Sequence, residues 1–370
     1  MYWTVKVDGG PRRVNHASVA IGSDIYSFGG YCSGVVYDGT QPIDVYVLHT
    51  DNFRWSRVDV DGEDYNDSST QLLTAPYQRY GHTVVEYSGK AFLWGGRNDD
   101  YGACNKMHAF DPCKRQWSSL NCEGKPPPAR DGHSACVNGD MMYVFGGYEE
   151  SSRRYSSETY AFNFETSRWC QVITTGEPPE WRDFHTSCII DNSMYVFGGR
   201  SDEMVEFQAS SEFYCNKLRR LDLRSNIWSE VKVVSEQPSG RRSHTAWTHG
   251  GRMYIFGGYL GTTNEHFNDL WEFNPKTLRW KQLFPVGVAP SPRRRHCTIV
   301  VNDQVFLFGG TTPVTSKKVD ASLSGLSELA DLHILDYSPS LKTLSAMAVL
   351  KNGLQKPFSY VLPYDLRLIL

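Results

Sequence analysis

A motif that returns six times along the chain restricts its fold more than any other feature. Each copy contains an arginine, a histidine three residues later, an apolar stretch and a Gly-Gly pair, and the histidine always precedes the first glycine by thirteen residues. Although 370 residues would otherwise suggest two or three domains, a repeat of this regularity predicts one large repeat domain. The copies lie at Arg13/His16/Gly29-Gly30, Arg79/His82/Gly95-Gly96, Arg130/His133/Gly146-Gly147, Arg182/His185/Gly198-Gly199, Arg241/His244/Gly257-Gly258 and Arg293/His296/Gly309-Gly310.

The residues between the repeated positions predict four short strands in each copy. One strand follows the histidine, and a turn such as Asn138-Gly139-Asp140 leads into a second strand that ends at the glycines. A variable loop and an alternating third strand follow. A fourth strand begins with tryptophan in five copies, at Trp55, Trp117, Trp169, Trp228 and Trp280. Four antiparallel strands in a repeat of about fifty residues are typical of a β-propeller blade.

The combination of aromatic residues and Gly-Gly pairs resembles the pattern of kelch repeats, and this resemblance covers roughly residues 2–337. We therefore expect an all-β fold, a six-bladed kelch β-propeller followed by a short C-terminal helical tail. The sixth copy has no tryptophan strand of its own. Because Trp3 precedes the first copy as Trp280 precedes the sixth, residues 2–7 are predicted to be the outer strand of blade six, which would close the ring and the domain 1–337.

Residues 338–370 have a different periodicity and are predicted to be helical. Ser338 can cap a helix and Pro339 suits its first position, with apolar residues at 341, 344 and 348 and a stop at Asn352-Gly353. This pattern predicts a short amphipathic helix outside the propeller. A second helix is expected from Pro363.

Composition excludes some classes of function. A formal net charge of −3 with 21% charged residues gives no global preference for nucleic acid or membranes, and no run of eighteen apolar residues occurs. The nine cysteines are scattered and form no Cys-x-x-Cys pair, which favours reduced thiols in a cytoplasmic or also nuclear protein. We expect neither a secretory signal nor a cofactor or metal.

The repeated histidines and arginines require different interpretations. Six histidines on a ring cannot converge as tetrahedral metal ligands, so we expect them to hydrogen-bond between adjacent blades. The arginines begin the innermost strands, and a ring of guanidinium groups around a concave mouth suits a carboxylate or phosphate. Alternatively, individual arginines pair with nearby acidic residues such as Asp131, Asp183 or Glu180 and only shape the loops.

The predicted ligand-binding residues follow from this hypothesis. Arg241 and Arg293 are the preferred pair because they belong to Arg-Arg and Arg-Arg-Arg clusters, and Arg182 beside Trp181 is third. Aromatic residues on the same loops, among them Tyr31, Tyr148 and Tyr259, would form the walls of a peptide pocket. The complete predicted set is Arg241, Arg293, Arg182, Arg79, Arg130, Arg13, Arg97, Arg200, Trp181 and Tyr80.

The tail resembles the elongin- and cullin-binding segment of kelch-repeat substrate receptors of cullin-2 RING ubiquitin ligases. Its first part, with Leu341, Leu344 and Val349, is similar to an elongin-binding box, although Ser345 stands where these receptors usually have cysteine. Its second part is similar to a cullin-2 box, in which the matching residues are Leu362, Pro363 and Leu366. The alternative for both parts is a purely structural role, as a helix folded on the underside of the propeller.

This resemblance implies a non-catalytic receptor. It implies that the tail binds elongin B/elongin C, cullin-2 and a RING subunit, and that the propeller mouth binds protein C-termini, typically ending in glycine. Two other classes stay open: a kelch scaffold that binds cytoskeletal or chromatin proteins without recruiting a ligase, and a copper-dependent oxidase. No Gly-x-Ser-x-Gly, His-Glu-x-x-His or Walker motif occurs, so we expect no enzyme.

Overall fold

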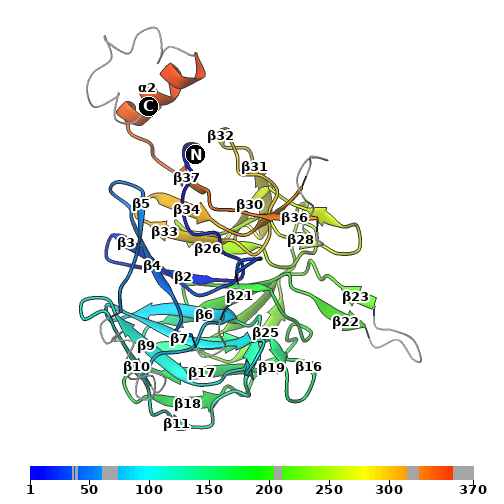
Figure 1. The fold of residues 1–370 in the computed structure, drawn as a ribbon. Helices are drawn as coiled ribbons and strands as arrows, with labels where there is room; N and C mark the ends of the chain where they lie inside the picture. Colours follow the sequence, from blue (N-terminus) through cyan, green and yellow to red (C-terminus); the bar gives the residue numbers. More distant parts are fainter. Residues whose placement is uncertain (36, 38–40, 61–73, 204–210, 315–324, 353–370) are drawn as a thin grey trace.

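The computed structural model describes residues 1–35, 37, 41–60, 74–203, 211–314 and 325–352. Strands dominate these residues, and they form six antiparallel blades stacked side by side (Figure 1). The innermost strands contact one another in the order β2, β6, β13, β20, β26, β33 and again β2, which is a closed circle. This arrangement confirms the predicted six-bladed β-propeller.

The blades contain the following strands, given from the innermost outward. Blade one has β2 (Ala17–Ile21), β3 (Asp24–Phe28), β4 (Val45–His49) and β5 (Arg54–Arg57), and blade two has β6 (Tyr80–Tyr87), β7 (Lys90–Asn98), β9 (Met107–Asp111) and β10 (Gln116–Ser119). Blade three has β13 (Ser134–Asn138), β14 (Met141–Phe145), β17 (Thr159–Asn163) and β18 (Arg168–Gln171), and blade four has β20 (Thr186–Ile190), β21 (Ser193–Phe197), β24 (Arg219–Asp222) and β25 (Ile227–Glu230). Blade five has β26 (Thr245–His249), β27 (Arg252–Phe256), β30 (Leu270–Asn274) and β31 (Arg279–Leu283), and blade six has β33 (Cys297–Val301), β34 (Gln304–Phe308), β37 (Leu332–Asp336) and β1 (Tyr2–Val7).

Shorter strands lie in the connections between the blade strands. On the loops that follow the Gly-Gly pairs or precede the innermost strands these are β8 (Gly102–Ala103), β12 (Arg130–Asp131), β15 (Tyr148–Glu149), β16 (Arg154–Tyr155), β22 (Ser201–Glu203), β23 (Ser211–Phe213), β28 (Tyr259–Leu260), β29 (Glu265–His266), β35 (Thr311–Pro313) and β36 (Leu326–Glu328). Three more pair in parallel with the outer strand of the following blade: β11 (Glu123–Gly124), β19 (Thr175–Gly176) and β32 (Val286–Gly287).

A ring of backbone hydrogen bonds closes the inner circle of the propeller. The residue two positions after each repeated arginine has a positive φ, between 49° and 69°, and its N–H donates to the carbonyl of the equivalent residue in the preceding blade at 2.7–3.3 Å. Glycine adopts this conformation freely in blades two and three, whereas Phe184 and Arg295 hold it against a steric cost. The six residues of the ring are Asn15, Gly81, Gly132, Phe184, Ser243 and Arg295.

The N-terminal strand completes blade six. β1 pairs antiparallel with β37, and the sheet order is β32-β1-β37-β34-β33. In each of the other blades, the tryptophan of the outer strand packs on the aromatic residue that precedes the Gly-Gly pair of the preceding blade, as Trp169 does on Trp94 at 5.4 Å between ring centroids. Trp3 packs in the same way on Phe256 at 5.7 Å, so it occupies the sixth tryptophan position.

The six repeated histidines link neighbouring blades. In four of them Nε2 is hydrogen-bonded, at 2.7–3.0 Å, to a hydroxyl on the innermost strand of the preceding blade, as in Ser134–His185. Burial, reinforced by the nearby arginines, lowers the pKa of His16, His82 and His244 to about 3, so the rings are neutral. In the parts of the chain that the structure describes, no three His, Cys, Asp or Glu groups are placed to hold a metal ion.

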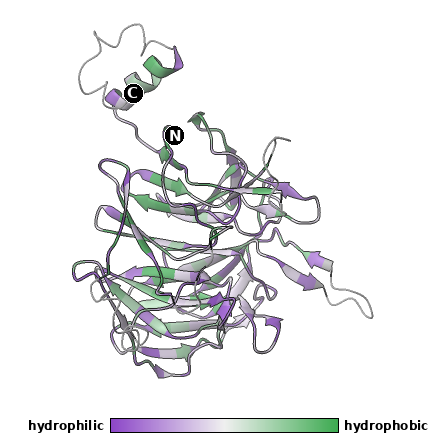
Figure 2. Ribbon diagram, in the orientation of Figure 1, coloured by the Kyte–Doolittle hydropathy of each residue, from purple (hydrophilic) through white to green (hydrophobic). Residues whose placement is uncertain are grey.

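The tail forms one described helix, α2 (Leu341–Lys351), which extends away from the blades (Figure 1). Its N-cap is Ser340, which accepts a hydrogen bond from the N–H of Thr343, so the predicted start at Ser338 and Pro339 is two residues too early. Apolar residues are spread around the helix and only Ala346 is buried, so the predicted amphipathic face is absent (Figure 2). No helix within the described ranges is long and apolar enough to span a membrane.

Candidate binding site at the propeller mouth

Each blade contributes one pair of facing residues to the mouth of the channel. The residue after the repeated arginine pairs with the residue after the Gly-Gly pair through antiparallel backbone bridges. Because these two positions vary from blade to blade, they determine the chemistry of the mouth. The pairs are Val14/Tyr31, Tyr80/Arg97, Asp131/Tyr148, Asp183/Arg200, Arg242/Tyr259 and Arg294/Thr311, in the order of the blades.

The six repeated arginines are buried and are not among the residues that line the cavity at this mouth, so they do not form the expected ring of free guanidinium groups. Their role in ligand binding stays a prediction. Their exposed fractions are 6% or less, and each Nη1 donates to the carbonyl of the first glycine of its own Gly-Gly pair, at 2.7–3.3 Å in blades two to six. These hydrogen bonds hold the turn that each glycine makes. The residues concerned are Arg13, Arg79, Arg130, Arg182, Arg241 and Arg293.

Carboxylates inside the blades neutralise four of these arginines. The preferred pair of the sequence analysis is an example: Arg241 contacts both oxygens of Asp269 at 2.5 and 2.9 Å, and Arg293 contacts both oxygens of Asp331 at 2.8 Å. Bidentate pairing of this kind leaves little capacity for an external anion. The alternative that these arginines pair locally and shape the loops therefore holds, although their partners are not the acidic residues that the sequence analysis named. Arg182 does contact Glu180, but through its backbone carbonyl.

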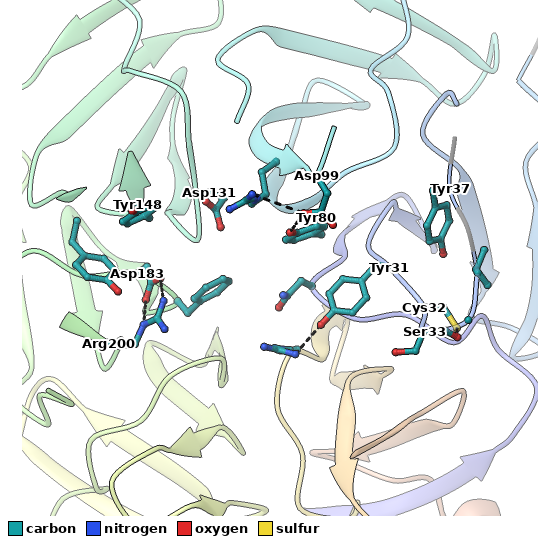
Figure 3. A pocket seen from close by; sticks show the side chains of 17 residues that line it. Tyr31, Cys32, Ser33, Tyr37, Tyr80, Asp99, Asp131, Tyr148, Asp183 and Arg200 are labelled. Atoms are coloured by element: carbon teal, nitrogen blue, oxygen red, sulfur yellow. Dashed lines mark hydrogen bonds and ion pairs between the residues drawn. The ribbon is translucent and has the colours of Figure 1, made fainter. Parts of the chain in front are cut away.

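A cavity of about 600 Å³ occupies part of the mouth (Figure 3). Among the predicted residues, Tyr80, Arg97 and Arg200 line it, as do Tyr31 and Tyr148. Trp181 and Tyr259 are not among its lining residues, and the indole of Trp181 instead donates to Asp202 at 3.1 Å.

The two predicted arginines in the cavity are locally compensated. Arg200 pairs with Asp183 at 2.7 Å, as the dashed lines in Figure 3 show, and Arg97 lies 3.5 Å from Glu150. The hydroxyl of Tyr80 donates to Asp99 at 2.7 Å. These side chains are therefore available to a ligand only in competition with existing partners.

Blades three and four make one side of the mouth acidic. Asp131 and Asp183 are 7% and 1% exposed, and both line the cavity. Burial, with the nearby charge of Asp183, raises the pKa of Asp131 to about 7. Burial also raises the pKa of Asp183, although Arg200 opposes this effect.

Blades five and six make the other side basic. Arg295 lines the cavity and donates to the hydroxyl of Tyr31 at 2.7 Å. The guanidinium of Arg294 lies over the ring of Tyr259 at 4.1 Å, and its buried Nε has no hydrogen-bond partner among the residues that the structure describes. Burial, together with the charges of Arg295 and Arg242, lowers the pKa of Arg294 to about 10.

This basic cluster, defined as Arg242, Arg294 and Arg295, is a candidate anion site at the mouth, where Arg295 lines the cavity. Arg242 lies 3.4 Å from Glu212, but neither Arg294 nor Arg295 forms an ion pair with a carboxylate in the portion of the chain described. Positive charge that is partly buried and uncompensated favours an anionic ligand. The Arg-Arg and Arg-Arg-Arg clusters are visible in the sequence, but their first members, Arg241 and Arg293, are buried and hold the Gly-Gly turns.

The tail presents a second candidate site, because the first leucine of its helix is exposed to solvent. Leu341 is 81% exposed, whereas Leu344 and Val349 are half-buried. The hydroxyl of Ser345 donates to the carbonyl of Leu341 at 2.8 Å within the helix. An apolar groove of about 700 Å³ separates α2, through Leu344, from β1 and β32. The predicted Leu362, Pro363 and Leu366 and the second helix lie outside the described residues.

Comparisons with known proteins place the chain in a family. A family profile described as the KLHDC2/KLHL20/DRC7 Kelch-repeats domain matches residues 81–310. The chain is 46% identical to kelch domain-containing protein 3 of Rattus norvegicus and 44% identical to that of Homo sapiens, over 99% of this chain and 94% of each relative. It is also 26% identical to kelch domain-containing protein 10 of Xenopus laevis over 94% of the chain and 84% of that relative. The chain therefore belongs to the kelch-repeat family and is a homologue of kelch domain-containing protein 3.

Proposed function

We propose that this protein is the non-catalytic substrate-recognition subunit of a cullin-2 RING E3 ubiquitin ligase, acting in the cytoplasm or nucleus. In this proposal the propeller mouth binds the C-terminal carboxylate of a target protein, and the tail recruits elongin B/elongin C, cullin-2 and the RING subunit. The observation that carries the proposal is that Arg295 lines a peptide-sized cavity and that neither it nor the neighbouring Arg294 forms an ion pair with a carboxylate among the described residues.

A peptide carboxylate matches the basic cluster in charge and in geometry. A carboxylate that enters a partly buried site loses hydration, and fixed guanidinium groups replace it with charge-assisted hydrogen bonds. The guanidinium of Arg295, which lines the cavity, offers such donors. Binding an anion would also relieve the repulsion among Arg242, Arg294 and Arg295 that lowers the pKa of Arg294. The preference for a C-terminal glycine is part of the proposal on the basis of the family resemblance alone.

Binding of free and amidated peptides tests this part of the proposal. With a glycine-ended peptide identified on a peptide array, amidation of the C-terminus is expected to weaken binding by roughly 30-fold, because a buried charge-assisted pair contributes about 2 kcal/mol or more. The double variant Arg294→Gln/Arg295→Gln should lose a similar factor, measured by fluorescence polarisation.

The control combines the two changes, amidation of the peptide and substitution of both arginines, as in a double-mutant cycle. Amidation should have little further effect on the double variant, because both changes remove the same contact. Arg97→Gln removes a guanidinium that already has partners and is expected to change binding less than about threefold. Equal binding of free and amidated peptides to the wild-type protein would show that the mouth does not recognise a carboxylate.

Leu341 is proposed to be an anchor for elongin C, because an 81% exposed leucine at the start of a helix is suited to insertion into a groove. Leu341→Ala is expected to lower elongin affinity by roughly 30-fold in a co-purification assay calibrated by titration, since a buried apolar anchor contributes about 2 kcal/mol. Phe284→Ala is the matched control, because Phe284 is also 81% exposed but lies on the propeller. Full elongin recovery with Leu341→Ala would contradict the recruitment proposal.

The scaffold alternative has one observation in its favour. Large apolar side chains are exposed on two outer connections, at Ile173 (76%) between blades three and four and at Phe284 (81%) and Val288 (74%) between blades five and six. Isolated exposed apolar residues are normal, but Ile173 and Phe284 recur at one position, four residues after the outer-strand tryptophan, and such a repeated feature favours contact with another protein. A scaffold of this kind would retain its partners when the tail from residue 338 is removed, whereas ligase recruitment would be lost.

A further inference from the structure

The surroundings of the repeated arginines differ among the six blades. In blades one, three, five and six an acidic residue immediately precedes the third blade strand and lies beside the buried arginine, and these residues are Asp44, Glu158, Asp269 and Asp331. Glu149 is a second carboxylate in blade three. Four buried guanidinium groups therefore have carboxylate partners inside their own blades.

Blades two and four depart from this pattern in the same way. The position of the acidic residue is occupied by Lys106 in blade two and by Lys217 in blade four, and a cysteine lies two residues earlier, in Cys-Asn-Lys. Neither Arg79 nor Arg182 forms an ion pair with a carboxylate within the described ranges. In blade four Cys215 interacts with Arg182 in the corresponding way, but Glu180 also contributes favourable charge to Arg182, and Lys217 is paired with Glu230 at 3.3 Å. Blade two is thus the more extreme case.

In blade two the backbone brings a cysteine close to a buried guanidinium: the N–H of Cys104 donates to the carbonyl of Gly96 at 2.9 Å, and Arg79 contacts the adjacent Gly95. Arg79 is 2% exposed, lies over the ring of Tyr77 at 4.2 Å, and donates through Nη1 to Gly95 at 3.3 Å. Its Nη2 is buried without a hydrogen-bond partner among the residues described. The side chain of Cys104 interacts with Arg79 and Tyr77, and its Sγ accepts the backbone N–H of Lys106 at 3.4 Å.

The electrostatics of this cluster favour an anion at the sulfur atom. Burial by itself would raise the pKa of the Cys104 thiol, but the charge of Arg79 and the hydrogen bond from Lys106 outweigh burial and lower that pKa. Burial raises the pKa of Tyr77, so among the described groups of this cluster Cys104 is better able to supply the negative charge that the other blades take from a carboxylate. It is 8% exposed, which leaves part of its surface open to solvent.

We propose that Cys104 takes the place of the missing carboxylate of blade two and that, in its ionised form, it is a site of covalent modification by soft carbon electrophiles. The thiolate is the nucleophilic form of cysteine, and a neighbouring arginine increases its population at neutral pH. With iodoacetamide, the sulfur forms a bond to the methylene carbon while the carbon–iodine bond breaks and iodide leaves. The thioether is uncharged, so Arg79 loses its counter-ion directly beside Tyr80, which lines the mouth.

Site-resolved alkylation tests this proposal independently of peptide binding and of ligase recruitment. The intact protein is exposed briefly to iodoacetamide between about pH 6 and pH 10, and the modification of each cysteine is measured by mass spectrometry. The rate at Cys104 is expected to rise with a midpoint at lower pH in the folded protein than in the same protein unfolded in urea. Solvent access changes the alkylation rate by the same factor at every pH, whereas a lower thiol pKa shifts the pH midpoint. Comparing the midpoints of the folded and unfolded protein therefore isolates the effect of ionisation.

Two substitutions at one position provide matched controls. Lys106→Asp restores the pattern of blades one, five and six, and its carboxylate would pair with Arg79, so the alkylation rate of Cys104 at pH 7 should fall about tenfold. Lys106→Ala keeps the backbone N–H that Cys104 accepts and should change the rate less than about twofold.

Three results would overturn the proposal: equal midpoints in the folded and unfolded protein, modification of Cys104 only after unfolding, or an unchanged rate in a folded Lys106→Asp variant. If the Lys106→Asp variant does not fold, the alkylation midpoints of the folded and unfolded wild-type protein are sufficient to test the proposal.

Discussion

Acidification from pH 7 to pH 5 is expected to unfold the propeller, because unfolding at low pH allows six buried histidines to take up protons. In the folded state burial lowers the pKa of His16, His82 and His244 to about 3, and it lowers the pKa of His133, His185 and His296 well below the usual value. In the unfolded chain each histidine titrates near pH 6.5. The unfolded state therefore binds more protons between these limits.

The sign and size of the effect follow from proton linkage. A histidine whose folded pKa is lowered contributes its full stability above pH 6.5 and loses it as the pH falls toward the folded pKa. Each such proton changes the free energy of unfolding by about 1.4 kcal/mol per pH unit, so six histidines give about 8 kcal/mol per unit. Asp131 acts in the opposite direction, because its pKa is raised to about 7, and removes about one proton from this total. Domains are stable by only about 5–15 kcal/mol, so the midpoint is expected near pH 5.

Urea unfolding at a series of pH values, monitored by tryptophan fluorescence, measures this slope. His82→Gln is the sharpest variant, because the Nε2 of His82 lacks a hydroxyl partner: the residue that would supply it is Ala17. Its loss should reduce proton uptake on unfolding by about one. A free energy of unfolding that is the same at pH 7 and pH 5 would contradict the neutral, buried state of the ring histidines.

The architecture of the propeller could be predicted from sequence because each blade repeats it. The constant spacing of thirteen residues between the repeated histidine and the first glycine reflects a β-hairpin of constant length. The position of Trp3 could be recognised because the other five blades have a tryptophan on the equivalent strand. The boundary of α2 was less accessible, because Ser338 and Ser340 are equally suitable caps two residues apart. The structure distinguishes them: the N–H of Ser338 donates to Asp336 at 2.8 Å and ends β37, whereas Ser340 caps the helix.

The binding site was harder to predict for a physical reason. A residue that occurs in every blade, such as Arg241, performs a task that every blade needs, in this case holding the first glycine of the Gly-Gly pair. Its partner Asp269 lies 28 residues away across a variable loop, so no local sequence pattern predicts that the two residues pair. Ligand chemistry is instead found where the repeat is broken, and Arg294 and Arg295 stand at positions that hold Asp131 and Gly132 in blade three. The departures from a repeat are thus better indicators of function than the repeat itself.

Replacement of Trp3 by alanine is expected to destabilise the protein by about 3–5 kcal/mol, because it removes a large buried aromatic side chain and leaves a cavity. Trp3 is 4% exposed and packs in an edge-to-face arrangement on Phe256 of blade five and on His333 of its own blade. It belongs to a cluster that joins blades five and six through Leu270 and Leu335. The substitution therefore weakens the contact between the first and last parts of the chain.

The expected loss corresponds to a melting temperature roughly 5 °C lower, because a propeller of this size has a large entropy of unfolding. Lys6→Ala on the same strand is the matched control, since its side chain is exposed and surface substitutions usually change stability by less than about 0.5 kcal/mol. Deletion of residues 1–8 should have a larger effect than Trp3→Ala, because it also removes the backbone pairing of β1 with β37 and leaves β37 as an open edge. If the deletion variant melted at the wild-type temperature, the N-terminal strand would not close the ring, and blade six would be stable with three strands.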